Sequence, residues 1–190
     1  MSSLQDGFDE LIDRMKSGQG LSRGSYEPIY YLIFSPKDIL QVKRNLPAWK
    51  AKLRLDGWDV QQFSMAEEIA DILNKAPMLN LWLAADKKAP LSWEKANQSL
   101  ANVITNGSLR NRLEIKLEQL QGQKDSILLV VDLEALHPYS RIGAIESQLY
   151  GKFYVPTVFF YPGERTGQTR LKFLGFYPED GNYRSVHIGG

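Results

Sequence analysis

Cysteine is absent from this chain of 190 residues, and histidine occurs only twice. Without cysteine the protein has no disulfide bond, thiolate nucleophile, iron–sulfur cluster or cysteine-bound zinc. The two histidines, His137 and His187, are far apart in the sequence and form no His-x-x-x-His pair of the kind that binds zinc from one helix face. We therefore expect no bound metal and no other cofactor.

A phosphate-binding loop is also missing, because no glycine is followed by Lys-Ser or Lys-Thr. The apolar run that ends at Asp132, with Glu134 close behind, does look like the magnesium-binding half of a phosphate-loop NTPase. However, Pro36 follows the first predicted strand, where such a protein needs a backbone N–H for phosphate. We therefore interpret Asp132 as a strand-end residue and expect a protein that is not an enzyme.

Long hydrophobic runs and an excess of charge of one sign are absent as well. No apolar run reaches the ~18 residues that cross a bilayer, and the N-terminal segment is acidic where a secretory signal would be basic. We expect a cytoplasmic protein that does not contact a membrane.

Lysine and arginine total 23 against 22 aspartate and glutamate residues, so we expect DNA binding to be weak or indirect. One short segment is rich in basic residues, which we interpret as a solvated helix face: Lys37, Lys43, Arg44, Lys50, Lys52 and Arg54.

The composition that is present favours a folded chain. Hydrophobic residues make up 43% and aromatic residues 11% of the sequence, which is more than a disordered chain carries. A length of 190 residues suits one domain. We therefore expect residues 1–190 to form a single domain with its own core.

Helical and strand patterns alternate along the first part of the chain. Apolar residues three and four apart predict a helix from Leu4 to about Ser17, and the β-branched and aromatic run Ile29 to Phe34 predicts a buried strand. Ser35 is placed to cap a following helix, which Pro47 should kink or divide. The alternation then continues with a strand from Trp58 to Phe63 and a helix from Met65 to Lys75 that Ser64 and Glu67 cap.

The second part of the chain begins with a segment, about residues 77–122, that is helical throughout and predicts a helical insert. Beyond it we expect strands over residues 127–132, 155–161, 171–176 and 183–188 and a short helix over residues 140–150. Apolar strands separated by helices imply an α/β fold, with a mainly parallel sheet flanked by helices on both faces. The short connection between the last two strands favours an antiparallel C-terminal edge.

Pro162 and Gly163 predict a sharp turn at the end of the strand before them. Proline fixes φ at one turn position, and glycine supplies a positive φ at the next. The turn would place Arg165 and Thr166 on a surface hairpin, where binding residues are common. The alternative is a turn that only connects two strands.

Tyrosine and arginine are combined in the C-terminal third. These residue types often dominate protein interfaces, and they also bind single-stranded nucleic acid; alternatively, the tyrosines lie in the core and the arginines in solvent. Arg141 begins a predicted helix, where the helix dipole opposes a cation, so we expect an acidic partner: Glu146, Glu164 or a carboxylate of another protein. The candidate binding residues are Tyr139, Arg141, Arg165, Arg170, Tyr183 and Arg184.

Four C-terminal segments resemble, in order and spacing, the BrxB family of bacterial phage-exclusion (BREX) systems. These segments are Leu136-His137-Pro138-Tyr139-Ser140-Arg141, Val155 to Glu164 (VPTVFFYPGE), Leu171 to Gly175 (LKFLG) and Tyr183-Arg184. The N-terminal helix, the aromatic strand and the Pro-Lys-Asp turn after it are also similar to this family. The likeness is weak between Pro77 and Gly122.

The resemblance implies a small, non-catalytic core component of a multi-gene defence system that blocks phage replication while host DNA is marked by methylation. It also implies partners among the other BREX proteins, which include a PglZ-like phosphatase-family protein, a large ATPase, a DNA methyltransferase and a helicase. We expect the PglZ-like protein to be the direct partner.

Two other classes of function stay open at this point. One is a nucleotide- or DNA-handling protein with a degenerate NTPase-like core, and the other is a hydrolase that uses Asp132 and Glu134. A pocket with convergent carboxylates would favour a hydrolase, whereas a flat apolar patch rimmed by arginine would favour protein binding.

Overall fold

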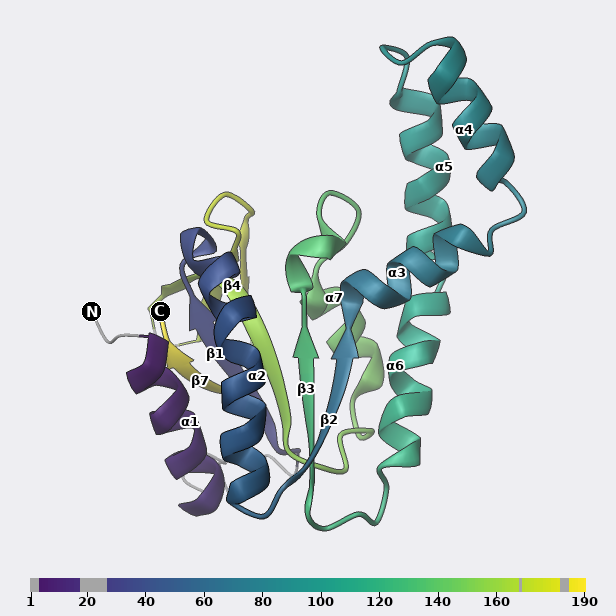
Figure 1. Cartoon of the computed structure of the whole chain (residues 1–190). Coiled ribbons are helices and arrows are strands. Elements are labelled where there is room, and N and C mark those ends of the chain that lie inside the picture. The colour runs from purple at the N-terminus through teal and green to yellow at the C-terminus, as the bar shows by residue number, and fades with distance from the viewer. Residues whose placement is uncertain (1–3, 18–26, 168, 182–184) are drawn as a thin grey trace.

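A mostly parallel sheet forms the centre of the computed structural model, which describes residues 4–17, 27–167, 169–181 and 185–190 (Figure 1). Five parallel strands lie in the order β2-β3-β4-β1-β7, and β5 and β6 continue antiparallel from the end of β4. This arrangement confirms the predicted α/β fold. The strands are β1 (Ile29–Phe34), β2 (Asp59–Ser64), β3 (Ser126–Val131), β4 (Thr157–Thr166), β5 (Arg170–Phe173), β6 (Glu179–Gly181) and β7 (Val186–Gly189).

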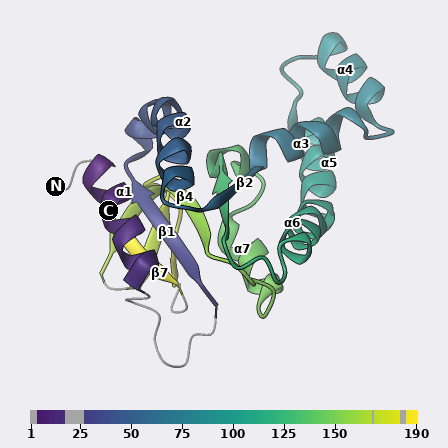
Figure 2. The same ribbon diagram turned by 60° about the horizontal axis from the view of Figure 1, so that its bottom comes forward.

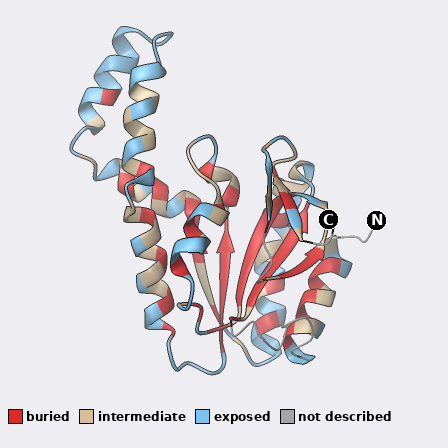
Figure 3. Cartoon of the chain, turned by 180° about the vertical axis from the view of Figure 1, so that it is seen from behind, coloured by how far each residue is buried: buried red, intermediate tan, exposed pale blue. Residues whose placement is uncertain are grey.

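Helices cover both faces of the sheet, as predicted. On one face α1 (Leu4–Ser17) and α2 (Ile39–Leu55) pack against strand residues such as Tyr30 and Leu32. On the other face α3 (Met65–Asn74), α6 (Ser108–Gln119) and the short α7 (Ile142–Glu146) pack against residues such as Ile29 and Tyr31. Successive side chains of a strand point to opposite faces, so every residue of β1 is buried. Burial on both sides explains the uninterrupted apolar run (Figure 3).

The predicted helical insert consists of α4 (Leu79–Lys88), α5 (Glu94–Thr105) and α6. Only α6 lies along the sheet for its length, whereas α4 and α5 extend away from it as an arm (Figures 1 and 2). Trp82 joins the two helices of the arm, because its indole N–H donates to Ser99 Oγ at 2.9 Å. Most of the arm is exposed (Figure 3).

Serine caps begin two of the helical segments. Ser35 Oγ accepts a hydrogen bond from the Lys37 N–H at 3.4 Å and starts a 3-10 turn, Pro36–Asp38, that runs into α2. Ser64 Oγ accepts from the Glu67 N–H at 3.2 Å at the start of α3. Both capping predictions are therefore confirmed.

Of the two effects predicted for Pro47, a kink or a division of the helix, the division is wrong, because α2 is continuous through this residue. A proline inside a helix removes one backbone hydrogen bond and crowds the preceding turn. Here Val42, Trp49 and Leu53 are buried on either side of Pro47. Their packing in the core on this face of the sheet stabilises the helix on both sides of the proline.

The predicted turn at Pro162 and Gly163 is also wrong, because β4 runs straight through both residues and the chain reverses after Thr166. Gly163 does not have a positive φ. A Cβ atom at this position would lie 2.5 Å from Lys172 O and 2.6 Å from the ring of Tyr161. Glycine is therefore required for close approach of β5 rather than for a turn.

The predicted antiparallel C-terminal edge is confirmed in part. β5 is antiparallel to β4 and β6 is antiparallel to β5, but β7 is parallel to β1. The strand expected over residues 171–176 ends at Phe173, because Leu174 and Gly175 take positive φ values of 53° and 76°. Of the strand expected over residues 183–188, residues 183 and 184 lie outside the described residues, and β7 begins at Val186.

No helix in the described part of the chain combines the length and the apolar composition that crossing a membrane requires.

Replacing Phe160 with alanine should lower the free energy of unfolding by about 3–5 kcal/mol, measured by urea titration. The ring is 2% exposed and packs against Trp49 with ring centroids 6.0 Å apart, so truncation leaves a cavity. Val155 and Val158 are equally buried and serve the core in the same way. Leu55→Ala is the control, because Leu55 is 89% exposed and its loss should change stability by less than about 0.5 kcal/mol. Equal stability of the two variants would contradict this placement of β4.

Candidate functional site

The predicted binding residues are divided between two loops. Arg165 pairs with Leu171 across the β4–β5 hairpin, and Arg170 pairs with Thr166. The two arginine side chains therefore point to opposite faces of the hairpin. Tyr139 and Arg141 precede α7, whereas Tyr183 and Arg184 lie outside the described residues.

Arg141 has an acidic partner, but this partner is Asp180 rather than Glu146 or Glu164. Arg141 Nη1 lies 3.0 Å from Asp180 Oδ1, and the guanidinium lies 5.8 Å from the centre of the Tyr177 ring. Asp180 belongs to β6, which reaches this position through its pairing with β5. A contact that depends on strand pairing leaves no signal near Arg141 in the sequence.

Tyr139 and Arg170 also have partners within the chain. The Tyr139 hydroxyl donates to Asn97 Oδ1 at 2.6 Å, which connects the loop before α7 to the arm. Burial raises the pKa of this tyrosine. Arg170 Nη1 lies 3.3 Å from Glu179 Oε2 on the neighbouring strand.

A cluster of aromatic side chains beside Arg141 was not predicted. The rings of Phe176 and Tyr177 stack with centroids 4.9 Å apart, and His137 meets them edge-on at 5.4 and 5.6 Å. His137 Nδ1 lies 2.6 Å from the Tyr177 hydroxyl, and Phe176 is 62% exposed. We call His137, Arg141, Phe176 and Tyr177 the aromatic–arginine patch. Two adjacent aromatics between a glycine and a proline were the available signal, because a turn does not bury both rings.

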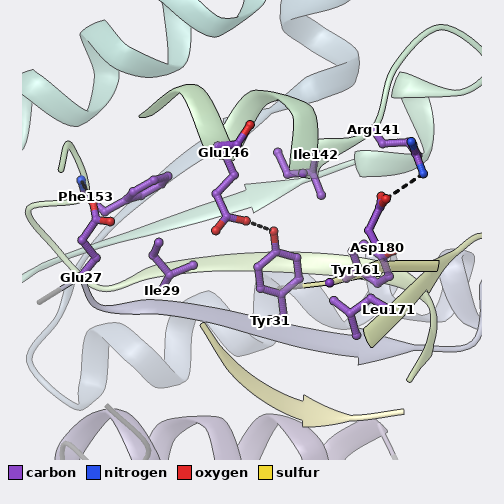
Figure 4. Close-up of a pocket in the computed structure, with 13 residues that line it drawn as sticks. Glu27, Ile29, Tyr31, Arg141, Ile142, Glu146, Phe153, Tyr161, Leu171 and Asp180 are labelled. Carbon is purple, nitrogen blue, oxygen red and sulfur yellow. Dashed lines mark hydrogen bonds and ion pairs between the residues drawn. The ribbon is translucent and has the colours of Figure 1, made fainter. Parts of the chain in front are cut away.

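A pocket of about 310 Å³ opens between the sheet and α7 (Figure 4). It exists because α7 has only five residues and leaves part of this face uncovered. The volume lies at the lower end of the range for small-molecule sites. Its apolar walls include Ile29, Ile142, Phe153 and Leu171, and its polar lining includes Glu27, Tyr31, Arg141, Glu146, Tyr161 and Asp180.

The polar groups of the pocket come from both of its sides. Glu146 points down from α7 and accepts a hydrogen bond from the Tyr31 hydroxyl, whereas the Arg141–Asp180 ion pair lies toward one end (Figure 4). Tyr161 is 3% exposed, and within the described residues its hydroxyl has no hydrogen-bonding partner. Burial and the charge of Asp180 raise the pKa of Tyr161 against the opposing charge of Arg141. The hydroxyl therefore stays protonated at neutral pH.

Glu27 lies at the opposite end of the pocket from Arg141 (Figure 4). Its Oε1 accepts hydrogen bonds from the backbone N–H groups of Gly151 and Phe153 at 2.7 and 3.2 Å. A buried carboxylate oxygen needs such partners, because burial removes the water that would otherwise donate to it. Glu27 thus fixes the turn after α7 and adds a negative charge to the pocket lining.

Carboxylates do converge in the pocket, but Asp132 and Glu134 are not among them. Asp132 follows β3 directly, with a φ of 60°, as expected for a strand-end residue. Lys43 Nζ lies 2.8 Å from Asp132 and 2.7 Å from Glu134, and the Ser64 hydroxyl donates to Asp132 at 2.5 Å. Burial lowers the pKa of Lys43, but both carboxylates raise it by a larger amount. A cation of the chain itself therefore neutralises this pair.

The basic segment around α2 is partly used inside the protein. Besides Lys43, Lys52 lies 2.6 Å from Asp9, and Lys50 donates to Gln62 Oε1 at 3.0 Å. The ion pairs of Lys43 and Lys52 reduce the positive charge that α2 presents to solvent, whereas Lys50 keeps its charge.

We expected neither a Glu-x-x-His ligand pair nor a Gly-x-Ser-x-Gly motif, but the sequence contains both spacings. Glu134 and His137 have Glu-x-x-His spacing, but Glu134 contacts Lys43 and His137 contacts Tyr177. In the described residues no three histidine, aspartate or glutamate side chains are grouped to hold a metal ion. Gly20 to Gly24 has Gly-x-Ser-x-Gly spacing and lies outside the described residues. It follows a helix and precedes a strand, the reverse of the order in a nucleophile elbow.

His187 should make stability depend on pH. Burial, and to a smaller extent the charge of Arg165, lower the pKa of His187 from 6.5 to about 4. Between these two pH values the imidazole is therefore protonated in the unfolded chain but neutral in the folded chain. The stabilisation is complete above pH ~6.5 and is lost as the pH falls toward 4, by about 3 kcal/mol. His187→Phe keeps a ring against Tyr31, which lies 5.6 Å away, and should remove this part of the dependence. Parallel stability profiles of the two proteins in urea titrations between pH 4 and 7 would show the assignment to be wrong.

The fold and these two surfaces define a three-layer α/β protein with a pocket under its shortest α-helix and an exposed aromatic patch beside it. The family model described as BREX protein BrxB matches residues 61–188. The chain belongs to the BrxB family and is therefore a component of a BREX phage-defence system. The match includes the patch and most of the pocket. It does not include α1 and β1, whose sequences also resemble this family. Neither the curated proteins nor the solved structures gave a match.

Proposed function

We propose that this chain is a non-catalytic, protein-binding component of its BREX system and that a partner docks on the aromatic–arginine patch. The observation that carries the proposal is the exposure of Phe176 within an ordered cluster of rings. Aromatic and arginine side chains contribute most of the binding energy at many interfaces. Stacking fixes the rings before a partner arrives, which lowers the entropy that docking loses.

Arg141 belongs to the same ordered surface. Its ion pair with Asp180 and its position over Tyr177 fix the direction of the guanidinium. A fixed guanidinium is suited to bind a carboxylate of a partner through two parallel hydrogen bonds. The patch therefore supplies both apolar area and a directed cation.

The partner that we propose is a PglZ-like phosphatase-family protein. BREX membership supports a partner among the other BREX proteins, and all four patch residues fall within the segment that matches the BrxB family model. Arg165 and Arg170, which belong to the tyrosine- and arginine-rich C-terminal third, lie on the β4–β5 hairpin.

The lack of catalysis is part of the proposal. Lys43 neutralises Asp132 and Glu134, and no phosphate-binding loop is present in the sequence. The second candidate, a nucleotide-handling protein with a degenerate NTPase-like core, is favoured by the place of Asp132 beside Ser64 at the carboxyl edge of a parallel sheet. Lys43 argues against it, because the lysine takes the position that a magnesium ion would need.

Replacing Arg141 or Arg165 with glutamate should weaken co-purification with the PglZ-like protein and lower protection against phage together. The melting temperature should stay within a few degrees, because an exposed ion pair such as Arg141–Asp180 contributes at most about 1 kcal/mol. Arg54→Glu is the control, since Arg54 lies on α2 across the sheet. If both variants retain full partner binding and protection, the C-terminal surface is not the interface, and α1 becomes the better candidate.

A further inference from the structure

The charge of the pocket under α7 is predominantly negative. Three carboxylates line it, those of Glu27, Glu146 and Asp180, against the one guanidinium of Arg141. The guanidinium is already paired with Asp180 at 3.0 Å. A phosphate or carboxylate ligand would therefore meet net repulsion, whereas a cation would be attracted.

The hydrogen-bonding groups of the pocket favour a ligand that donates. Tyr161 is almost fully buried and faces the pocket with a hydroxyl that has no partner within the described residues. A hydroxyl oxygen accepts hydrogen bonds as well as donating one, and the carboxylate oxygens of Glu146 and Asp180, which only accept, lie in the same lining. Ammonium and guanidinium groups carry only donors, so they match this lining.

The remaining walls of the pocket are apolar. Ile29 and Leu171 lie on the sheet side and Ile142 on the α7 side (Figure 4). Apolar walls next to charged groups suit the methylene stem of a lysine- or arginine-like molecule, whose head stays with the polar groups.

From the charge, the unpartnered hydroxyl and the apolar walls together we propose that this pocket binds an ammonium or guanidinium group on a short hydrocarbon stem. The chemistry is shared by a small free amine and by a lysine or arginine side chain of a docked protein. The second source rests on the proposed function, because Arg141 belongs to both the pocket and the patch.

The test is a titration of the protein with n-butylguanidine, followed by calorimetry or NMR, with n-butylurea as a neutral ligand of the same shape. The guanidine should bind, and the urea should bind at least roughly tenfold more weakly. Glu146→Gln keeps an acceptor for Tyr31 but removes the charge, so it should weaken guanidine binding by roughly tenfold. Tyr161→Phe should weaken binding as well. Glu94→Gln, on the exposed arm, is the matched control and should bind like the wild type.

Equal binding of the two ligands, no saturable binding of the guanidine, or an undiminished affinity of Glu146→Gln would overturn the proposal. The source of the cation is identified by adding n-butylguanidine to the complex with the PglZ-like protein. Displacement of that protein shows that its side chain fills the pocket, and a stable complex with guanidine bound identifies a free amine. Partner binding through the patch without any guanidine binding would refute this inference and leave the proposed function standing.

Discussion

Replacing Gly163 with alanine is expected to lower the free energy of unfolding by about 3 kcal/mol, although only one methyl group is added. The new Cβ would lie 2.5 Å from the backbone oxygen of Lys172 and 2.6 Å from the Tyr161 ring. Relief requires β5 to move away from β4, which also displaces the wall of the pocket. For a chain of this length the melting temperature should fall by roughly 6–12 °C.

Gly143→Ala is the matched control for this substitution. Gly143 lies in α7, and a Cβ there would meet only Asp180 Oδ2 at an ordinary 3.8 Å. Alanine in a helix is favoured over glycine, so this variant should be at least as stable as the wild type. If Gly163→Ala melts like Gly143→Ala, β4 does not run through Gly163 into the hairpin. The turn that the sequence predicted at Pro162 and Gly163 would then be correct.

Replacing Phe176 with aspartate should weaken partner binding by about a hundredfold, the effect expected for a central interface residue. The substitution removes an exposed ring of the patch and brings a charge into the contact. Folding should be preserved, because the side chain is 62% exposed. Affinity for the purified PglZ-like protein, measured by calorimetry beside a circular dichroism melt, gives both quantities.

Trp93→Asp is the control for the Phe176 substitution. Trp93 is 60% exposed and lies on the arm, away from the patch, so its loss removes an equally exposed large ring elsewhere. This variant should bind the partner as the wild type does. The opposite result, loss of binding in Trp93→Asp with binding retained in Phe176→Asp, would assign the interface to the arm.

Most of the fold could be predicted from local patterns. The runs that became β1 and β3 are apolar throughout, and both strands are buried throughout. The two serine caps were predictable because a cap depends on residues next to one another in the chain. The helical insert was predicted correctly as a set of helices, but its projection as an arm depends on tertiary packing.

The errors occurred where distant segments meet. Proline and glycine in sequence usually indicate a turn. Gly163 is instead needed because the backbone of Lys172, nine residues later, approaches it closely, and local reasoning does not include that contact. The direction of β7 is set by its pairing with β1, which lies more than 150 residues earlier. Neither relation has a local signal.

The candidate site was predicted only in part for the same reason. Arg141 was identified together with its need for an acidic partner, but Asp180 is brought to it by the pairing of β5 and β6. The pocket combines β1, α7, β4 and β6, so no segment of the sequence contains it. Phe176 and Tyr177 lay within the C-terminal third that we singled out, yet their exposure follows from the turn after β5.

The central claim is that this chain works by holding another BREX protein on its aromatic–arginine patch. The most direct test is a tagged pull-down from cells that carry the whole defence locus, quantified by mass spectrometry, with the wild-type chain and Phe176→Asp compared side by side. The PglZ-like protein should be enriched with the wild type and lost with the variant, while the two chains are present in equal amounts. No enrichment of any BREX protein with the wild type, or equal enrichment with both chains, would contradict it.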